Sequence, residues 1–184
     1  DGINIKDYKL SNLRKNIGIV LQDVFLFSDS IFNNITLKDD TISLNQVKLA
    51  AKQIGVHNFI MSLPNNYYYN VKERGIMLSS GQRQLIAFLR VYVSDPQILI
   101  LDEATSSIDS KSEILIQNAT EKLTKNRTSL IIAHRLATIK KANNIIVMDS
   151  GNIIEQGSHK ELISNLDGYY KKLYDVQFQV KNVS

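Results

Sequence analysis

The chain has 184 residues, enough for one domain with a substantial hydrophobic core, and its 43% hydrophobic content is ordinary for a soluble globular protein. Its formal net charge is +4, but the Lys and Arg residues are scattered, so charge alone predicts no nucleic-acid partner. The chain contains no Cys, which excludes a disulfide framework and a thiolate metal site. No stretch approaches the roughly 20 uncharged apolar residues that a membrane-spanning helix needs.

The first half of the chain combines one short strand with helices. The apolar, β-branched run over 17–21 predicts a strand that ends just before Gln22. Residues 43–55 place apolar side chains at helical spacing behind a capping box, and 80–93 predicts a second helix. Pro96 lies just beyond this second helix and should end it.

The second half alternates strands with helices. Strands are predicted at 97–102, 128–133 and 144–149, with helices at 110–124 and 136–142 between them. A glycine turn, a short strand and two further helices complete the chain, and Ser158 and Glu161 predict a capping box at the start of the first of these helices. The alternation and the nearly apolar strands predict an α/β fold with parallel strands covered on both faces. Right-handed crossovers would bring the carboxyl ends of these strands to one edge, where ligands bind in such sheets.

Polar residues occupy that predicted edge. Gln22, Asp102 and His134 each lie at or just past the carboxyl end of a strand. In "ILILDEATSSID" (98–109) Asp102 is placed to hold Mg²⁺, and the adjacent Glu103 could deprotonate a water that attacks a γ-phosphate. His134 could donate to a phosphate oxygen, and Gln22 could bind the metal or a water. The alternatives are solvated acids at a strand end, a structural histidine and an amide that satisfies local backbone.

A second candidate site is "LSSGQRQ" (78–84). Two hydroxyls and a glycine stand at the start of a predicted helix, where free N–H groups and the helix dipole favour an anion. Gly81 would let a phosphate approach the backbone closely. The alternative is an ordinary helix cap made by Ser79 or Ser80.

These motifs, in this order and spacing, resemble the nucleotide-binding domain of ATP-binding cassette (ABC) transporters over almost the whole chain. The family's Q-loop is similar to "VLQDVFLF" (20–27), its exporter X-loop to "VKERG" (71–75) and its signature motif to "LSSGQRQ" (78–84). Walker B with the D-loop is similar to "ILILDEATSSID" (98–109), the H-loop to "IIAHRL" (131–136) and the exporter tail to "GNIIEQGSHKEL" (151–162). The resemblance implies a P-loop NTPase-type ABC ATPase core, a mostly parallel sheet flanked by helices. Within one partial domain over 1–184, it implies a helical signature subdomain at about 38–95 and the Walker B, D-loop, H-loop and C-terminal helices at 96–184.

The resemblance also implies roles for single residues. Glu103 would be the catalytic base and His134 would contact the γ-phosphate, while Asp102 and Gln22 would hold Mg²⁺. Asp109 in the D-loop would couple two sites across a dimer. The signature residues would meet ATP bound by the opposite subunit; they are Ser79, Ser80, Gly81 and Gln82.

The X-loop and Q-loop segments imply coupling to a membrane-spanning domain. Glu73 and Phe25 are the candidate coupling residues, and Phe25 belongs to an apolar-aromatic stretch whose members could instead be core. Two positions depart from the family pattern. Ser80 replaces the first of the two signature glycines, and Lys72 replaces a usual X-loop glycine.

The implied function is ATP hydrolysis that drives export of a substrate across a membrane. ATP and Mg²⁺ are the implied cofactors, and a second nucleotide-binding domain and a transmembrane domain are the implied partners. The domain would lie at the cytoplasmic face of the membrane, with no nucleic acid involved. Two alternatives remain open: a soluble ABC-type ATPase of DNA repair or translation, and a non-catalytic remnant of a split gene.

One element of the family pattern is absent from the sequence. None of the eight glycines begins a Gly-Lys-Ser/Thr sequence, so the Walker A phosphate loop is not found. In the family this loop precedes the position at which this chain starts. We therefore expect an N-terminally truncated domain that exposes apolar sheet surface. We also expect the 184 residues alone to bind Mg-ATP weakly and not to turn it over.

Overall fold

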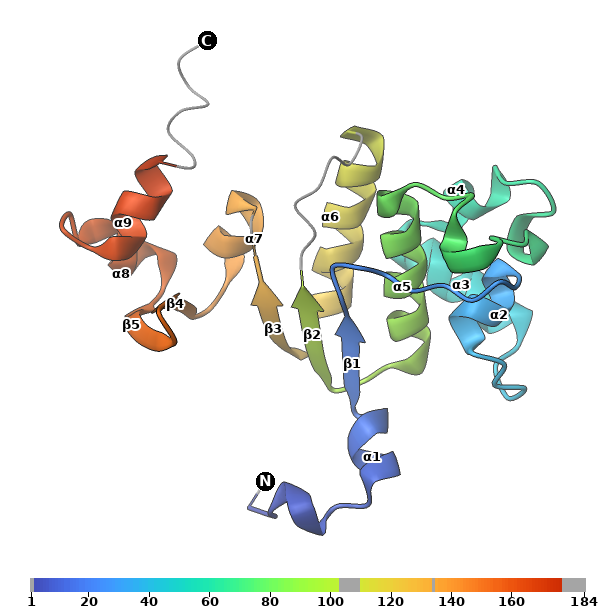
Figure 1. The fold of residues 1–184 in the computed structure, drawn as a ribbon, viewed down its shortest axis with the longest axis horizontal. Helices are drawn as coiled ribbons and strands as arrows, with labels where there is room; N and C mark the ends of the chain where they lie inside the picture. Colours follow the sequence, from blue (N-terminus) through green and yellow to red (C-terminus); the bar gives the residue numbers. More distant parts are fainter. Residues whose placement is uncertain (1, 103–109, 134, 177–184) are drawn as a thin grey trace. The chain divides into compact units, whose positions relative to one another are not determined.

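The computed structural model describes residues 2–102, 110–133 and 135–176. The chain divides into two compact units, Asp1–Ile132 and Ala133–Ser184, and each is described by itself. Figure 1 shows the elements of both units in the colours of the sequence.

The first unit contains a small sheet and most of the helices. Its strands are β1 (Ile17–Val20), β2 (Ile98–Asp102) and β3 (Thr128–Ile132). Its α-helices are α1 (Leu10–Lys15), α2 (Ile31–Thr36), α3 (Leu44–Ile54), α4 (His57–Met61), α5 (Ser80–Ser94) and α6 (Ser110–Thr124). Three short 3-10 helices accompany them: η1 (Ile5–Asp7), η2 (Asn66–Tyr68) and η3 (Glu73–Gly75). No helix in the described ranges is both long enough and apolar enough to cross a bilayer.

The sheet of the first unit is parallel, as the sequence predicts. The strand order is β1-β2-β3, with Val20 opposite Leu101 and Leu101 opposite Ile131. All three arrows point the same way in Figure 1, so the carboxyl ends meet at one edge. The predicted strands over 17–21, 97–102 and 128–133 are confirmed to within a residue at each end.

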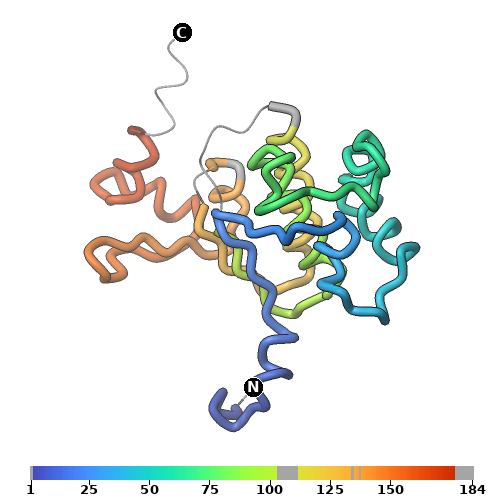
Figure 2. Tube along the Cα trace, turned by 45° about the vertical axis from the view of Figure 1, so that its right-hand side comes forward, coloured from blue at the N-terminus to red at the C-terminus, as the bar shows by residue number. Residues whose placement is uncertain are grey.

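Helix α5 lies at the centre of the first unit. It packs against β1 and α6 on one side and against α2 and α3 on the other (Figures 1 and 2). Ser79 caps its first turn, and Asp95, in a left-handed conformation with φ 46°, ends it directly before Pro96. The sequence predicts both the helix and its end. The helix is buried on nearly all sides, so its position fixes that of the surrounding elements.

Strand β1 approaches α5 so closely that only glycine fits at one position. A Cβ atom built on Gly18 would lie 2.6 Å from Cγ of Pro96 and 2.6 Å from Cγ1 of Val91. Atoms at that separation overlap, and the proline ring cannot rotate away. Gly18 therefore sets the spacing between the sheet and the helix.

One face of the sheet is covered and the other is not. Val20, Leu99 and Leu101 point towards the helices and are at most 3% exposed. On the opposite face apolar side chains remain substantially exposed: Ile19, Ile98, Leu130 and Ile132. The expectation of exposed apolar sheet surface is confirmed, whereas burial on both faces is not seen for this three-stranded sheet.

The second unit is a hairpin packed with short helices. Its elements are α7 (Leu136–Lys141), β4 (Ile145–Asp149), β5 (Asn152–Gly157), α8 (His159–Ser164) and α9 (Tyr169–Tyr174). Val147, Leu162 and Tyr170 form its core. The predicted capping box at the start of α8 is present, with Ser158 and Glu161 bonded to each other's backbone.

The prediction that 144–149 continues a parallel sheet is wrong for the pairing observed. Strand β4 pairs antiparallel with β5 in a two-stranded sheet. The turn residues explain this, because Ser150 and Gly151 both have positive φ, 47° and 81°. Such a two-residue turn returns the chain directly into an antiparallel hairpin.

Replacement of Gly18 by Ala should destabilise the first unit by roughly 1–3 kcal/mol, because the added methyl overpacks the interface with α5. Denaturant unfolding measures the change. The double variant Gly18→Ala with Val91→Ala should recover part of the loss, since it removes one of the two overlapping atoms. An unchanged free energy of unfolding in Gly18→Ala would contradict the close packing.

Candidate functional site

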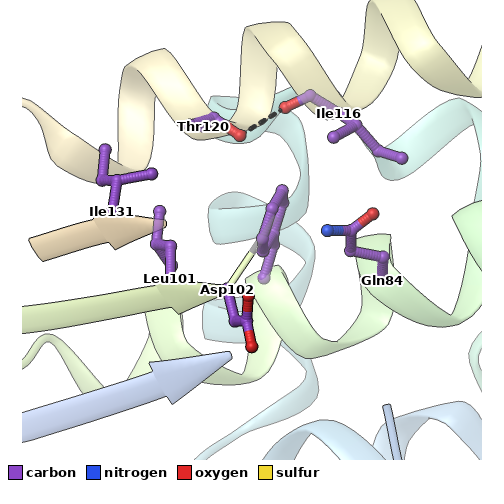
Figure 3. A pocket seen from close by; sticks show the side chains of 7 residues that line it. Gln84, Leu101, Asp102, Ile116, Thr120 and Ile131 are labelled. Atoms are coloured by element: carbon purple, nitrogen blue, oxygen red, sulfur yellow. Dashed lines mark hydrogen bonds between the residues drawn. The ribbon is translucent and has the colours of Figure 1, made fainter. Parts of the chain in front are cut away.

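The carboxyl edge of the sheet carries two of the predicted site residues. Asp102 is the last residue of β2, and Gln22 lies two residues beyond the end of β1, the strand that pairs with β2. Figure 3 shows Asp102 at the tip of β2 with its carboxylate directed away from the strand. Asp102 is half-buried and Gln22 is exposed. Glu103, Asp109 and His134 lie outside the described residues.

A small apolar cavity lies behind Asp102, between the sheet and helices α5 and α6 (Figure 3). Gln84 of α5 lines it, is only 3% exposed, and has a side-chain oxygen without a hydrogen-bond partner in the described part of the chain. Leaving such an oxygen unpaired costs about 1–3 kcal/mol. Gln84 is a polar residue of the site that sequence reasoning missed. The available signal was its place on the buried face of the signature helix.

Ser79 acts as the cap of helix α5, as the alternative interpretation proposes. Its Oγ accepts from the backbone N–H of Gln82 at 3.2 Å, and Oε1 of Gln82 accepts from the backbone N–H of Ser79 at 3.0 Å. This capping box occupies the acceptor side of the Ser79 hydroxyl. The hydroxyl hydrogen can still be donated, so a cap and an anion contact are compatible.

The departure at Ser80 costs no backbone strain. Ser80 is the first residue of α5 and is not among the non-glycine residues with positive φ. A serine therefore replaces the family's glycine in a conformation that any residue adopts. Gly81 follows it and is buried.

An open hollow brings three of the motifs together. Gln22 of the Q-loop, Ser80 of the signature and Glu73 of the X-loop all line it. The remaining lining residues are Asp23, Val24, Lys72, Arg74, Ile76 and Arg83. The hollow is thus mixed in charge, with three cationic and two anionic side chains.

Lys72 has an unusual backbone conformation at the rim of this hollow. Its φ of 62° and ψ of −172° fall in a region that essentially only glycine occupies, at a cost of about 1–3 kcal/mol. The chain is held on both sides, because the Val71 N–H donates to the Asp29 carbonyl at 3.0 Å and the Gly75 N–H to the Lys72 carbonyl at 3.2 Å. The second departure from the family pattern, unlike Ser80, therefore introduces strain.

The aromatic stretch after Gln22 is divided between core and surface. Leu26 and Ile31 are completely buried, and Phe32 is half-buried. Phe25 and Phe27 are instead 55% and 52% exposed, and their rings meet edge to face with centroids 5.1 Å apart. We call Phe25 and Phe27 the aromatic pair. The core interpretation holds for the two aliphatic residues and fails for Phe25.

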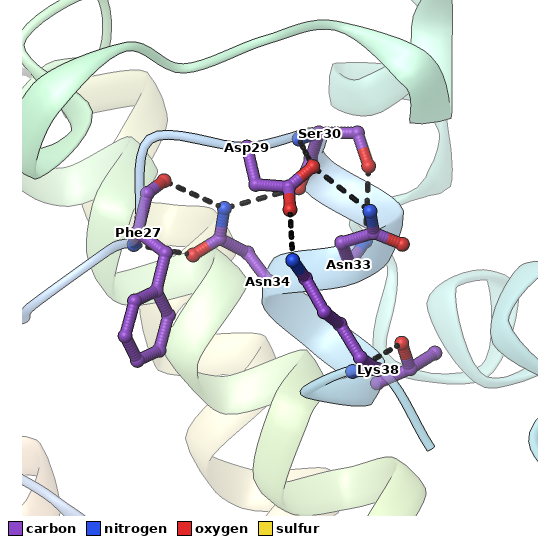
Figure 4. Close-up of polar contacts among 7 residues, drawn as sticks. Phe27, Asp29, Ser30, Asn33, Asn34 and Lys38 are labelled. Carbon is purple, nitrogen blue, oxygen red and sulfur yellow. Dashed lines mark hydrogen bonds and ion pairs between the residues drawn. The ribbon is translucent and has the colours of Figure 1, made fainter. Parts of the chain in front are cut away.

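A polar network lies beside Phe27 at the start of α2 (Figure 4). The Asp29 carboxylate accepts from the Ser30 N–H at 2.7 Å and from the Asn33 side chain at 2.8 Å, and pairs with Lys38 at 3.1 Å. The Ser30 N–H bond, followed by those to Asn33 and Lys38, lowers the pKa of Asp29. Ser30 in turn caps α2 through the Asn33 N–H.

Residues 1–106, more than half of the chain, match a family model described as ABC transporter. The chain belongs to the ABC transporter family. The resemblance read from the motifs is confirmed, and the ABC ATPase fold with it.

Several relatives of this ABC protein carry names that refer to export. It is 49% identical over 177 residues to a Staphylococcus aureus (strain Mu50) protein whose name assigns it provisionally to multidrug export as an ATP-binding/permease protein. A similarly named Bacillus subtilis protein is 48% identical. Each match covers 96% of this chain and 30% of the relative's length. Among solved structures, a bacterial Atm1-family ABC exporter with ATP bound matches with a TM-score of 0.84 at 40% identity, over 96% of this chain and 31% of that one.

These names do not favour a soluble ATPase of DNA repair or translation. The chain spans about a third of the length of the proteins it matches. At the level of the family, these comparisons support a nucleotide-binding domain of the ABC exporter type.

The donor set at the sheet edge fits a magnesium ion. Mg²⁺ takes oxygen ligands and is usually held by one or two protein groups together with phosphate oxygens and waters. The Asp102 carboxylate and the Gln22 amide oxygen are such groups and lie at the same edge. The described residues contain no cluster of three or more His, Cys, Asp or Glu side chains, so a closed all-protein site is not formed by them.

Replacement of Ser79 by Ala should destabilise the protein by about 1 kcal/mol, because the Gln82 N–H loses its acceptor. Ser79→Asp should leave stability close to that of the wild type, since Asp is an equally good helix cap and its charge suits the N-terminus. Thermal unfolding of both variants makes the comparison. A Ser79→Ala variant as stable as the wild type would show that the capping bond contributes nothing, and equal losses in the two variants would show that the loss has another cause.

Proposed function

We propose that this chain is the ATP-binding and hydrolysing part of an exporter that moves a substrate across a membrane. The observation that carries the proposal is the common sheet edge of Gln22 and Asp102, in a chain whose relatives are named for export. The proposal includes hydrolysis of ATP, the cofactors ATP and Mg²⁺, and two partners, a second nucleotide-binding domain and a transmembrane domain.

The chemistry is in-line attack of a water on the γ-phosphate of ATP. Asp102 and Gln22 hold Mg²⁺, which when bound offsets the negative charge that develops on the phosphate oxygens. Glu103, the next residue after Asp102, takes the proton of the attacking water. His134 donates to a γ-phosphate oxygen.

The signature acts on ATP held by a second nucleotide-binding domain. Ser79 can donate its hydroxyl hydrogen to a γ-phosphate oxygen while it remains the cap of α5. Gly81 lets the phosphate approach the backbone, and the dipole of the 15-residue helix favours the anion. Ser80 and Gln82 flank this contact, and Asp109 couples the two sites of the dimer.

Export requires a transmembrane partner at the cytoplasmic face of the membrane. Phe25 is exposed, and Glu73 shares the open hollow with Gln22, so both can respond to a docked segment. We further propose that residues 1–184 by themselves lack hydrolysis, because their sequence supplies no Walker A phosphate cradle.

Glu103→Gln in the full-length protein should lower ATP hydrolysis by at least about 100-fold, because the base that activates water is lost. ATP binding should persist, since the phosphate contacts remain, and an ATP-bound dimer should accumulate. Phosphate release and size-exclusion chromatography with ATP measure the two effects.

The matched control is Glu121→Gln, which removes the same charge from an exposed position of α6. It should hydrolyse ATP as the wild type does. Turnover of Glu103→Gln at the wild-type rate would remove Glu103 from its role and with it the proposed reaction.

Phe25→Ala and the charge reversal Glu73→Lys should leave nucleotide affinity unchanged and reduce transport. Both side chains lie outside the phosphate contacts and on surface that a membrane domain can reach. Nucleotide titration and vesicle transport of the full-length variants separate binding from coupling. Transport at the wild-type rate in both variants would refute the coupling roles.

A further inference from the structure

The aromatic pair lies on a segment without regular structure. Residues 21–29 form neither helix nor strand, so the orientation of Phe25 and Phe27 is not fixed by a backbone ladder. Their exposed rings contact each other and contribute little burial. Something else must hold this segment if it is to transmit a displacement.

Asn34 of α2 holds the backbone of Phe27 at both of its polar groups. Its Oδ1 accepts from the Phe27 N–H at 2.8 Å, and its Nδ2 donates to the Phe27 carbonyl at 3.0 Å and to the Ser30 carbonyl at 3.0 Å (Figure 4). The Asn34 side chain is completely buried and uses both donors and its acceptor. A buried, fully paired amide of this kind specifies one geometry for the segment.

Arg90 of α5 completes the attachment. Its Nε donates to the carbonyl of Asn34 at 2.8 Å, and one Nη donates to the carbonyl of Phe25 at 3.3 Å. Burial lowers the pKa of Arg90, but a guanidinium remains charged at neutral pH, so both are charge-assisted bonds. One side chain of α5 thus holds both the aromatic segment and the residue that holds Phe27.

The same helix begins at the signature motif. Arg90 lies ten residues after Ser80, about 15 Å along a continuous α-helix. Leu26, which lies between Phe25 and Phe27 in sequence, is buried and packs next to Gly75, where a Cβ would lie 2.9 Å from Cδ1 of Leu26. The aromatic segment is therefore fixed to α5 through Arg90 and Asn34 and adjoins the X-loop through Leu26.

We propose that Arg90 and Asn34 form a polar clamp that makes the aromatic pair move with helix α5. They are positioning residues, because the groups that they bond are backbone N–H and carbonyl groups of this chain. When the N-terminus of α5 engages ATP across the dimer, the clamp carries that displacement to Phe25 and Phe27. The inference rests on the proposed function, because it assigns the aromatic pair to the coupling surface.

Arg90→Lys in the full-length protein tests the clamp. Lysine keeps the charge but cannot present the two donors of the guanidinium fork to two carbonyls. Hydrolysis without cargo should stay near the wild-type rate, whereas the amount of cargo transported per ATP hydrolysed should fall about tenfold. Reconstituted vesicles allow both quantities to be measured on one sample.

Arg127→Lys is the matched control. Arg127 belongs to the same unit, donates to the carbonyl of Leu123 at 2.6 Å and lies over the ring of Tyr92, but holds no part of the aromatic segment. The Arg127→Lys variant should lose stability as Arg90→Lys does, but it should keep the wild-type amount of cargo transported per ATP hydrolysed. A wild-type ratio in a folded Arg90→Lys variant would overturn the clamp, as would an equal loss in Arg127→Lys.

Hydrogen exchange of the wild type gives a second test that needs no variant to fold. The amide of Phe27 should be protected both without nucleotide and in an ATP-trapped state, because the segment moves as one body with α5. Loss of protection in either state would overturn the proposal. If the full-length wild type in reconstituted vesicles hydrolyses no ATP, the proposed function itself fails, and the inference fails with it.

Discussion

The burial of helix α5 is the constraint on which the first unit depends. The helix packs against the sheet, α6, α2 and α3, and its buried residues surround the axis: Gly81, Gln84, Leu85, Ile86, Ala87, Phe88, Leu89 and Val91. Each large apolar side chain among them stabilises the fold by about 1.5–3 kcal/mol through burial. Because Gly18 has no side chain, strand β1 can lie close to this helix. An element held this firmly can transmit displacement without deforming.

Helix α5 also carries polar groups at its N-terminus, at Gln84 and at Arg90, where apolar side chains do not cover it completely. Its N-terminus presents Ser79 and free N–H groups to solvent, and Gln84 faces the cavity behind Asp102. Arg90 reaches carbonyls of an otherwise irregular segment. One helix thus connects the proposed phosphate contact, the end of strand β2 with the proposed metal ligand Asp102, and the aromatic pair. The strained backbone of Lys72 lies in a loop that is held on both sides.

Local patterns in the sequence predict most of the strands and helices. The period of apolar residues predicted the three parallel strands and the long helices, and capping boxes marked the starts of α3 and α8. Asp102 and Gln22 could be placed at one edge because parallel strands align their carboxyl ends. The antiparallel pairing of β4 was missed, since it depends on positive φ at Ser150, which the sequence does not display. Arg90 and Asn34 were also missed. Their partners are backbone carbonyls and N–H groups, and Arg90 bonds to carbonyls 56 and 65 residues away in sequence, so residue type gives no sign of them.

In the proposed dimer, the edge with Asp102 and the start of α5 act on two different ATP molecules. A structure of the full-length protein with Mg²⁺ and a non-hydrolysable ATP analogue, determined by cryo-electron microscopy, tests it most directly. We expect Asp102 and Gln22 at the metal of one nucleotide, with Ser79 and Gly81 at the γ-phosphate of the other. A start of α5 that faces solvent, or the nucleotide of its own subunit, would contradict it.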